Sequence, residues 1–394
     1  MLNPTLAATL GPMRAPFLLL VPAVIALAWA SAFYDGQPVR LCDLLLAFFG
    51  AMAAHISVNA LNEYEDFRSG LDLHTKRTPF SGGTGTLPTH PEKAPLALLV
   101  GVVSLMLVFA VGAWFVYRRG PALIPLGLVG VALIVFYTRF LTRSPLWCLL
   151  APGLAFGPIM VLGAYFALTG HYGVTPAVAS LLPLFLVSNL LLMNQFPDQE
   201  ADATVGRYHL LLARGPAAGV AVYGLFIAGA YASVLIAVLT GYLPLASLLV
   251  LLSLPPALLA HQGLRRHHAD IPALVPHMAQ NVALNLSAPL LLSLGLFLSG
   301  DGLARDEVAE RSLSQLVNQQ LDYDGRLVRV QGTLRSHPSP LHYWVEDDEL
   351  HRVEISPMPG VTELLGMIVS VEGVFHYQRD RGRTIDVRSL VPVE

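Results

Sequence analysis

Long apolar runs dominate the first 300 residues of the chain. Each run is close to the 20 or so residues that a helix needs to cross the hydrocarbon core of a bilayer, and short stretches with Gly, Pro or charge separate them. The pattern predicts nine spans, at about residues 14–34, 41–61, 95–117, 121–138, 147–169, 176–195, 217–239, 243–261 and 280–299. The first run has an A-x-A-like end, as a secretory signal would, but its length favours a retained helix.

Beyond residue 305 the pattern changes from long runs to alternation. Val328, Val330 and Leu334 fall on one face of residues 326–334, and similar segments follow at 341–348, 351–357, 368–378 and 384–393. Short alternating segments between turn-rich pieces predict a small antiparallel barrel, which we expect to be of the oligonucleotide/oligosaccharide-binding (OB) type. The fold class is therefore an all-α polytopic membrane protein, a nine-helix bundle over residues 1–300, followed by a small all-β domain over 306–394.

Composition agrees with a membrane protein. Of 394 residues, 54% are hydrophobic and only 13% are charged, whereas soluble domains are about 25% charged. The tail after residue 300 holds 10 basic and 16 acidic residues, and this acidic balance argues against nucleic acid as a partner, since OB grooves that bind it are basic. Cys42 and Cys148 lie in or beside apolar runs and are interpreted as small hydrophobic residues.

Basic residues predict the orientation of the bundle. With the N-terminus in the cytoplasm, the cytoplasmic loops carry eleven Lys and Arg and the opposite loops carry three. Positive charge favours the inside. We therefore expect a multi-pass protein of the cell (inner) membrane, with the C-terminal domain on the side opposite the cytoplasm.

Seven of the eleven acidic residues before residue 301 lie in two short segments. Glu63, Glu65, Asp66 and Asp72 follow the second predicted span, and Asp198, Glu200 and Asp202 follow the sixth. By the predicted orientation both segments face the cytoplasm. Charged groups at membrane depth are costly, so such clusters indicate a functional site.

The spacing within each segment suggests a metal–phosphate site. Asn62 and Asp66 are four residues apart, as are Asn194, Asp198 and Asp202 in turn, so each set shares a helix face if the segments are helical. Carboxylates with amide oxygens suit Mg²⁺, which completes its shell with phosphate and water. Nearby Lys76, Arg77 and Arg207 would contact phosphate oxygens.

These segments resemble the two acidic motifs of the UbiA superfamily of intramembrane prenyltransferases. NALNEYEDFRSGLD (59–72) is similar to N-D-Y-x-D-x-x-x-G-x-D, and NQFPDQEADATVGRYHLLLARG (194–215) is similar to the second motif. The sequences FYTR and LAFGPIMVLGAYFALTG between them also match. The likeness covers about residues 12–300 and is greatest to the branch that prenylates dihydroxynaphthoate in menaquinone synthesis.

The resemblance implies a nine-helix bundle whose cavity opens sideways to lipid. It implies that a polyprenyl diphosphate and Mg²⁺ bind on the cytoplasmic side, and that the prenyl group passes to an aromatic, quinone-precursor-like acceptor. Asp66 and Asp198 would be the catalytic acids. The metal–diphosphate ligands would be Asn62, Asp66, Asp72, Asn194, Asp198 and Asp202, and by family position Tyr137 and Arg139 would contact substrate.

Three departures from the family pattern concern the site. Glu63 stands where Asp is usual, GRYH (206–209) replaces GKRT, and Cys148 and Leu149 replace a Gly-Glu pair. The glycine-rich segment TPFSGGTGTLP (78–88) is expected to cover the site. A transporter that uses the two carboxylate clusters for cations or protons is the alternative, although transporters place such groups near the midplane. A CDP-alcohol phosphotransferase is disfavoured, because its D-G-x-x-A-R core is absent.

Overall fold

The chain folds into two units, one helical and one of β-strands. The computed structural model describes residues 11–300, 308–320, 323–339, 341–358, 360–378 and 382–393. The helical unit comprises residues up to 35 and 39–299, and the second unit comprises 36–38 and the residues from 300 onward. The two units are described separately below.

Within the described residues, eight helical segments are long and apolar enough to cross a membrane. They are Phe17–Tyr34, Leu41–Ser69, Pro91–Arg119, Pro145–Thr169, Val174–Thr204, Pro216–Leu239, Leu245–His267 and Ile271–Ser299. The predicted span at 121–138 is a shorter apolar helix, Pro121–Phe136. The membrane bundle is therefore confirmed, with eight long helices and one short one.

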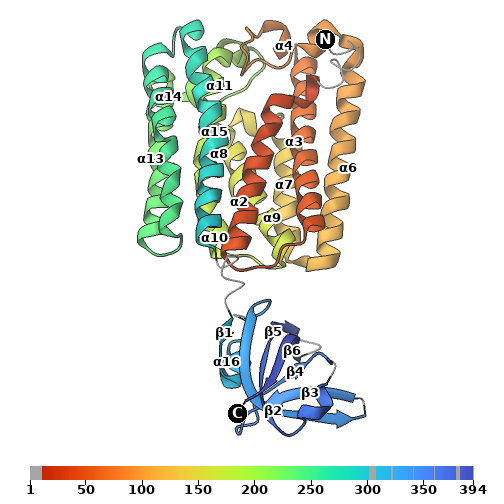
Figure 1. Cartoon of the computed structure of the whole chain (residues 1–394). Coiled ribbons are helices and arrows are strands. Elements are labelled where there is room, and N and C mark those ends of the chain that lie inside the picture. Colours follow the sequence, from red (N-terminus) through yellow and green to blue (C-terminus); the bar gives the residue numbers. More distant parts are fainter. Residues whose placement is uncertain are drawn as a thin grey trace, which may run out of the picture. The chain divides into compact units, whose positions relative to one another are not determined.

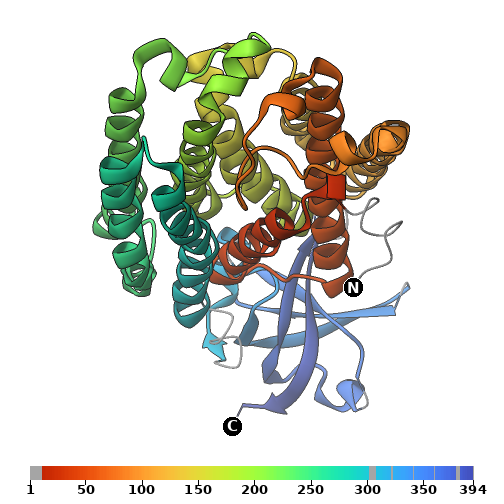
Figure 2. The same ribbon diagram turned by 90° about the horizontal axis from the view of Figure 1, so that it is seen from above.

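The regular elements of the bundle subdivide some of these segments. The helices are α2 (Leu20–Tyr34), α3 (Leu41–Ser69), α4 (Leu71–His74), α5 (Thr86–Thr89), α6 (Ala94–Arg119), α7 (Ile124–Phe136), α8 (Pro145–Leu154), α9 (Met160–Thr169), α10 (Val174–Ala179), α11 (Leu181–Thr204), α12 (Leu210–Arg214), α13 (Pro216–Leu239), α14 (Leu254–His267) and α15 (Ile271–Ser299). A π-helical turn, Ala155–Ile159, joins α8 to α9. Figures 1 and 2 show α2 between α15 and α3, with α13 and α14 on one side and α6 on the other.

Several predicted helices end too early in the sequence. The helix predicted to end at residue 61 continues to Ser69, and the one predicted to end at 195 continues to Thr204. The span predicted to end at 261 also continues, because the polar run HQGLRRHH (261–268) belongs to α14 as far as His267. Apolar windows stop where polar residues begin, but the backbone stays helical because its hydrogen bonds do not depend on side-chain polarity.

The chain leaves the helical unit at the end opposite to the acidic segment of α3. Arg14, which precedes α2, contacts Glu63 with an N–O distance of 3.2 Å. At the other end of α2, the ring of Trp29 packs on Phe297 near the end of α15, with the centroids 5.0 Å apart. The C-terminal end of α15 and the acidic end of α3 therefore lie at opposite ends of the bundle (Figure 1).

The second unit contains a closed five-stranded barrel. Its strands are β2 (Leu327–Pro338), β3 (Leu341–Glu346), β4 (Arg352–Ile355), β5 (Ile368–Gln378) and β6 (Gly382–Pro392), in the order β2-β3-β4-β6-β5, and β5 pairs back with β2. The β4–β6 pair is parallel and the others are antiparallel. A two-residue strand, β1 (Ala309–Glu310), and helix α16 (Leu313–Asn318) precede the barrel. The five strands match the five predicted segments.

Alternation places the barrel core as the sequence predicts. Val328, Val330 and Leu334 of β2 are buried, and they pack with Val345, Val371 and Phe375 among others. Ser312 caps α16 through a capping box with Gln315, which satisfies two backbone N–H groups of the first turn.

Two glycines of the α8–α9 segment allow close packing on α11, the helix of the second acidic segment. A Cβ atom at Gly153 would lie 2.1 Å from the Leu184 carbonyl oxygen, and one at Gly157 would lie 2.6 Å from that of Ser180. Small residues four apart let membrane helices approach at the backbone. Gly153 and Gly157 therefore fix the position of α11.

We predict that Gly153→Ala lowers the melting temperature of the purified protein by several degrees, because its methyl group would overlap backbone atoms of α11 and overpacking costs about 1–3 kcal/mol. Gly112→Ala in α6 is the matched control, since nothing lies within 4 Å of a Cβ atom there. Equal melting temperatures for the two variants would contradict the packing described.

Candidate functional site: a polar pocket beside an apolar cavity

The first acidic segment forms the last turns of α3 and the short α4. Asn62 donates a hydrogen bond to Asp66 at 3.0 Å, which confirms that the two share a helix face. Gly70 ends α3 in a left-handed conformation, with φ 79°, which glycine adopts without steric cost. The turn at Gly70 brings Asp72 into the same pocket as Asp66, where both side chains are buried.

The second acidic segment is the last three turns of α11. Asn194, Asp198 and Asp202 follow one another at intervals of four within one continuous helix, and Pro197 lies inside it. All three line the pocket that Asp66 and Asp72 also line. The structure therefore brings together the two segments that lie more than 120 residues apart in the sequence.

Arg207 joins the two segments. Its guanidinium group hydrogen-bonds Asp66 of α3, and its Nη1 donates to Asp202 Oδ1 at 3.0 Å. Burial acts to lower the pKa of Arg207, but the charges of Asp66 and Asp202 outweigh it and raise the pKa above its ordinary value. Arg207 is therefore charged throughout the physiological range, and its single positive charge is shared between one acid from each segment.

The glycine-rich segment covers the pocket, as expected. Phe80, Ser81, Gly82 and Gly83 line it. A Cβ atom at Gly83 would lie 2.9 Å from Asp72 Oδ1, and φ there is 71°. Only glycine allows the backbone to come this close to the carboxylate in that conformation.

Glu63 anchors the glycine-rich segment instead of facing the pocket. Its fully buried side chain accepts hydrogen bonds from the Thr84 backbone N–H at 3.0 Å and from Arg14 Nη2 at 3.2 Å. The departure from Asp to Glu therefore falls at a residue that positions the loop. No sequence pattern indicates the roles of Arg14 and Thr84, because Arg14 also fits the positive-inside pattern.

Two carboxylate oxygens in the pocket, Asp72 Oδ2 and Asp198 Oδ1, are buried and have no hydrogen-bond partner among the described residues. The pocket has a volume of about 100 Å³. Unpaired buried acceptors are costly, so these two oxygens indicate that the pocket is built to bind a cation or a donor. No cluster of three or more His, Cys, Asp or Glu side chains in the described part of the chain is already arranged as a metal site.

The remaining predicted contacts divide into two groups. Tyr137 lines the pocket. Lys76 is exposed and lies 3.8 Å from Glu200, Arg77 is exposed, and Arg139 lies 3.3 Å from Glu65. None of these three basic residues is part of the pocket lining, and their contact with substrate stays a prediction.

His209 and Cys148, which the sequence marked only as departures, line the pocket as well. His209 Nε2 lies 3.3 Å from Asp202 Oδ2. Cys148 Sγ accepts a hydrogen bond from Gln195 Nε2 at 3.4 Å. Two of the departures from the family pattern, at Cys148 and His209, are therefore changes in the wall of the site.

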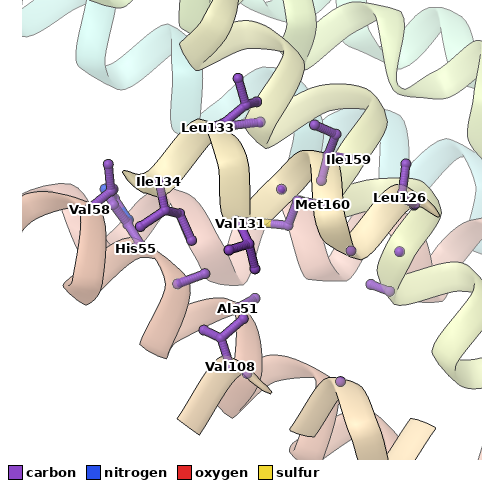
Figure 3. Close-up of a pocket in the computed structure, with 18 of the residues that line it drawn as sticks. Ala51, His55, Val58, Val108, Leu126, Val131, Leu133, Ile134, Ile159 and Met160 are labelled. Carbon is purple, nitrogen blue, oxygen red and sulfur yellow. The ribbon is translucent and has the colours of Figure 1, made fainter. Parts of the chain in front are cut away.

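An apolar cavity of about 590 Å³ adjoins the polar pocket. Arg14, Asn62, Tyr137 and Leu191 line both. Figure 3 shows side chains from α3, α6, α7 and the segment around Met160 directed into the cavity, among them Ala51, Val58, Val108, Val131, Ile134 and Ile159. The pocket and the cavity together could hold one ligand that has a charged group at one end and a long hydrocarbon chain at the other.

A model of the UbiA prenyltransferase family matches residues 19–279. The chain belongs to this family. It is a prenyltransferase and a multi-pass integral membrane protein, so the transporter alternative does not apply.

Curated relatives and solved structures agree with this assignment. The chain is 28% identical over 267 residues to the 1,4-dihydroxy-2-naphthoate octaprenyltransferase of Bacillus subtilis, which covers 66% of this chain and 83% of the relative. It is 26% identical over 217 residues to UbiA prenyltransferase domain-containing protein 1 of Xenopus tropicalis, covering 53% and 59%.

The fold of the bundle is that of a UbiA homolog from Aeropyrum pernix K1, with a TM-score of 0.50 at 18% identity over 73% of this chain and 98% of that one. A digeranylgeranylglyceryl phosphate synthase structure gives the same TM-score at 13% identity, over 75% and 98%. The residues matched by the family model include both acidic segments.

The donor set of the pocket fits a hard divalent cation. Carboxylate and amide oxygens are the ligands of Mg²⁺ in proteins, and Asp66, Asp72, Asp198, Asp202, Asn62 and Asn194 all line the pocket. The unpartnered oxygens of Asp72 and Asp198 supply acceptors that no protein donor occupies in the described residues.

We predict that Asp72 makes metal-free protein less stable as pH rises from about 4 to about 7. Burial, with the charges of Glu63 and Asp66, raises the pKa of Asp72 to about 7, whereas an unfolded Asp titrates near about 4. In that window the folded state holds a proton that the unfolded state has lost, so the free energy of unfolding falls with pH.

The measurement is the melting temperature in EDTA at pH 5 and pH 8. Asp72→Asn should raise it at pH 8 more than at pH 5, because the amide stays neutral. The exposed Glu200→Gln is the control and should change both values equally. A pH-independent effect of Asp72→Asn would contradict the prediction.

Proposed function

We propose that the protein transfers a prenyl group from a polyprenyl diphosphate to an aromatic, quinone-precursor-like acceptor within the membrane, releasing diphosphate, with Mg²⁺ as cofactor. One observation carries the proposal: a pocket lined by paired carboxylates and two arginines adjoins a 590 Å³ apolar cavity. A ligand that fits both has a polyanionic head and a long hydrocarbon tail. A polyprenyl diphosphate has this shape, and membership in a prenyltransferase family supports it.

The metal would be held by Asn62, Asp66, Asp72, Asn194, Asp198 and Asp202. Bound Mg²⁺ would supply positive charge to the diphosphate as it leaves. Arg14 and Arg207, which lie far apart in the sequence, both line this pocket and would bind phosphate oxygens. The planar guanidinium group of Arg207 can donate two parallel hydrogen bonds to a phosphate. To do so Arg207 would exchange its contacts with Asp66 and Asp202 for contacts with phosphate.

Tyr137 lies between the two spaces and lines both. With the diphosphate of the donor in the pocket and its prenyl chain in the cavity, the carbon that loses the diphosphate would lie beside Tyr137. An aromatic face stabilises a nearby cation. Tyr137 would therefore favour the developing positive charge at that carbon.

The acceptor is proposed from the relatives. The Bacillus subtilis relative is named for transfer to 1,4-dihydroxy-2-naphthoate, and a bicyclic aromatic acceptor is the hypothesis for this chain. Cys148 and Leu149 are buried where related enzymes have Gly-Glu; Cys148 lines the pocket and Leu149 belongs to the apolar core, so neither position supplies a carboxylate to the site. This favours an acceptor that needs less polar contact at that side.

The protein would lie in the cell (inner) membrane, with the site on its cytoplasmic side. The basic residues of the loops, eleven against three, support this orientation, and the chain leaves the helical unit at the end opposite to the acidic segments. The β-domain would then lie on the other side of the membrane. Its acidic composition supports a partner other than nucleic acid.

We predict that Asp66→Asn and Asp198→Asn each reduce prenyl transfer by at least about 100-fold, since removing one preorganised charge or donor costs about 10²–10³ in rate. The assay uses purified protein, Mg²⁺, prenyl diphosphates of several lengths and 1,4-dihydroxy-2-naphthoate with other aromatic acceptors. Glu65→Gln is the matched control, because Glu65 is next to Asp66 and does not line the pocket. Near-normal turnover of either Asn variant would refute the assignment.

We predict that a protease-cleavable tag after Glu394 is cut from the outside of intact spheroplasts, while a tag before Met1 is protected. If the shorter helix Pro121–Phe136 crosses as well as the eight long ones, the nine crossings of the proposal place the two ends on opposite sides. Cleavage of both tags from one side would refute the proposed orientation, whatever the activity.

A further inference from the structure

Of the described residues that line the apolar cavity, five have polar side chains. Arg14, Asn62 and Tyr137 also line the acidic pocket, and Asn59 donates a hydrogen bond to a backbone carbonyl oxygen at 3.1 Å. The fifth is His55 of α3. It lines the cavity but not the acidic pocket, so neither the cation nor the diphosphate explains a polar side chain there.

His55 lies two helical turns further along the cavity than Asn62. His55, Val58, Asn59 and Asn62 all line the cavity, and their intervals of three and four residues place them on one face of α3. Seven residues of helix rise about 10 Å. The imidazole therefore lies beyond the acidic pocket, where Figure 3 shows it with Val58 and Ile134 among the side chains that line the cavity.

The imidazole of His55 is buried and lacks a hydrogen bond. The residue is only 6% exposed, and its Nδ1 atom has no partner among the described residues. The ring packs edge to face on Phe156, with the centroids 4.9 Å apart, which fixes the ring without supplying a hydrogen-bonding atom. A neutral imidazole has one donor and one acceptor, and leaving such atoms unpaired is costly. The ring is therefore suited to a ligand that enters the cavity with a hydrogen-bonding group.

The prenyl chain cannot supply this group, because a hydrocarbon has neither a donor nor an acceptor. The aromatic acceptor can, since a hydroxyl group both donates and accepts. The neighbouring wall leaves space for a flat ring beside the imidazole: Ala51 and Ala54 line the cavity from α3, and Ala151 and Ala155 line it from α8 and the π-turn. The acceptor is therefore the substrate that matches His55.

We propose that His55 is a specificity-determining residue that binds a hydroxyl group of the aromatic acceptor inside the apolar cavity. The proposal rests on the proposed function and specifies its acceptor: a hydroxyl-bearing aromatic compound that lies along α3, between the reacting carbon beside Tyr137 and the imidazole. A site that hydrogen-bonds a substrate hydroxyl rejects the analogue that lacks it, because the buried polar group of the site is then left unpaired.

The test compares wild type with His55→Leu, His55→Phe and His55→Gln, using geranyl diphosphate as the donor. The acceptors are 1,4-dihydroxy-2-naphthoate and the two analogues that each lack one hydroxyl group, 1-hydroxy-2-naphthoate and 4-hydroxy-2-naphthoate. We expect wild type to prefer the dihydroxy acceptor over one of the analogues by at least about tenfold in kcat/KM. The Leu and Phe variants should lose this preference, because neither side chain can form a hydrogen bond.

The two substrates should respond differently to the loss of the imidazole. The Leu and Phe variants should raise KM for the dihydroxy acceptor by at least about tenfold, while KM for geranyl diphosphate stays as in wild type. The Gln variant keeps a hydrogen-bonding amide and should recover most of the preference. Losing a hydroxyl group also changes the reactivity of the ring, but it does so equally in every variant, so the change in preference isolates the contact with His55.

His90→Leu is the control. His90 is an exposed histidine that lines neither the cavity nor the pocket. Its variant should treat the three acceptors and the donor as wild type does.

The outcomes separate the two proposals. If wild type transfers the geranyl group to no aromatic acceptor, the proposed function fails and the role of His55 fails with it. If wild type uses only acceptors without a hydroxyl group, or if the Leu and Phe variants keep the wild-type preference, the role of His55 is overturned while the function stands. Leu and Phe differ in shape, so a folding defect in one variant, seen by its melting temperature, leaves the other as the test.

Discussion

The contact of Arg207 with Asp66 and Asp202 is the interaction on which the site depends. Buried charges are tolerated only when they are paired, and this guanidinium group pairs with one acid from α3 and one from α11. It holds the ends of two helices together that would otherwise repel each other. The same group is a good phosphate ligand, so the residue that stabilises the free protein is also suited to bind the substrate head.

The charge balance also explains why the other two aspartates differ. Asp72 and Asp198 have no basic partner at hydrogen-bond distance among the described residues, and each keeps an unpartnered oxygen. Glu63, in contrast, is fully engaged by Arg14 and Thr84. The acids of this cluster therefore have three different roles. Asp66 and Asp202 pair with Arg207, Glu63 anchors the covering loop, and Asp72 and Asp198 each keep an oxygen available to a cation.

Backbone proximity sets the shape of the site. Gly153 and Gly157 bring α8 and the π-turn against α11, and Gly83 brings the covering loop against Asp72. Gly112 and Gly127 do the opposite, since they leave space that no neighbouring atom fills. Only the surrounding atoms therefore distinguish the glycines that close packing requires from those that it does not.

The sequence by itself determined the membrane bundle, the alternating strands of the barrel and the two acidic segments, because hydrophobic period and four-residue spacing are local properties. Asn62 with Asp66, and Asn194 with Asp198 and Asp202, share helix faces for that reason. The tertiary structure alone decided that Arg14 and Thr84 hold Glu63, that Arg207 joins α3 to α11, and that Lys76, Arg77 and Arg139 lie outside the pocket. It also decided that His55 lines the apolar cavity. These outcomes depend on contacts between residues far apart in the chain, which no local pattern encodes.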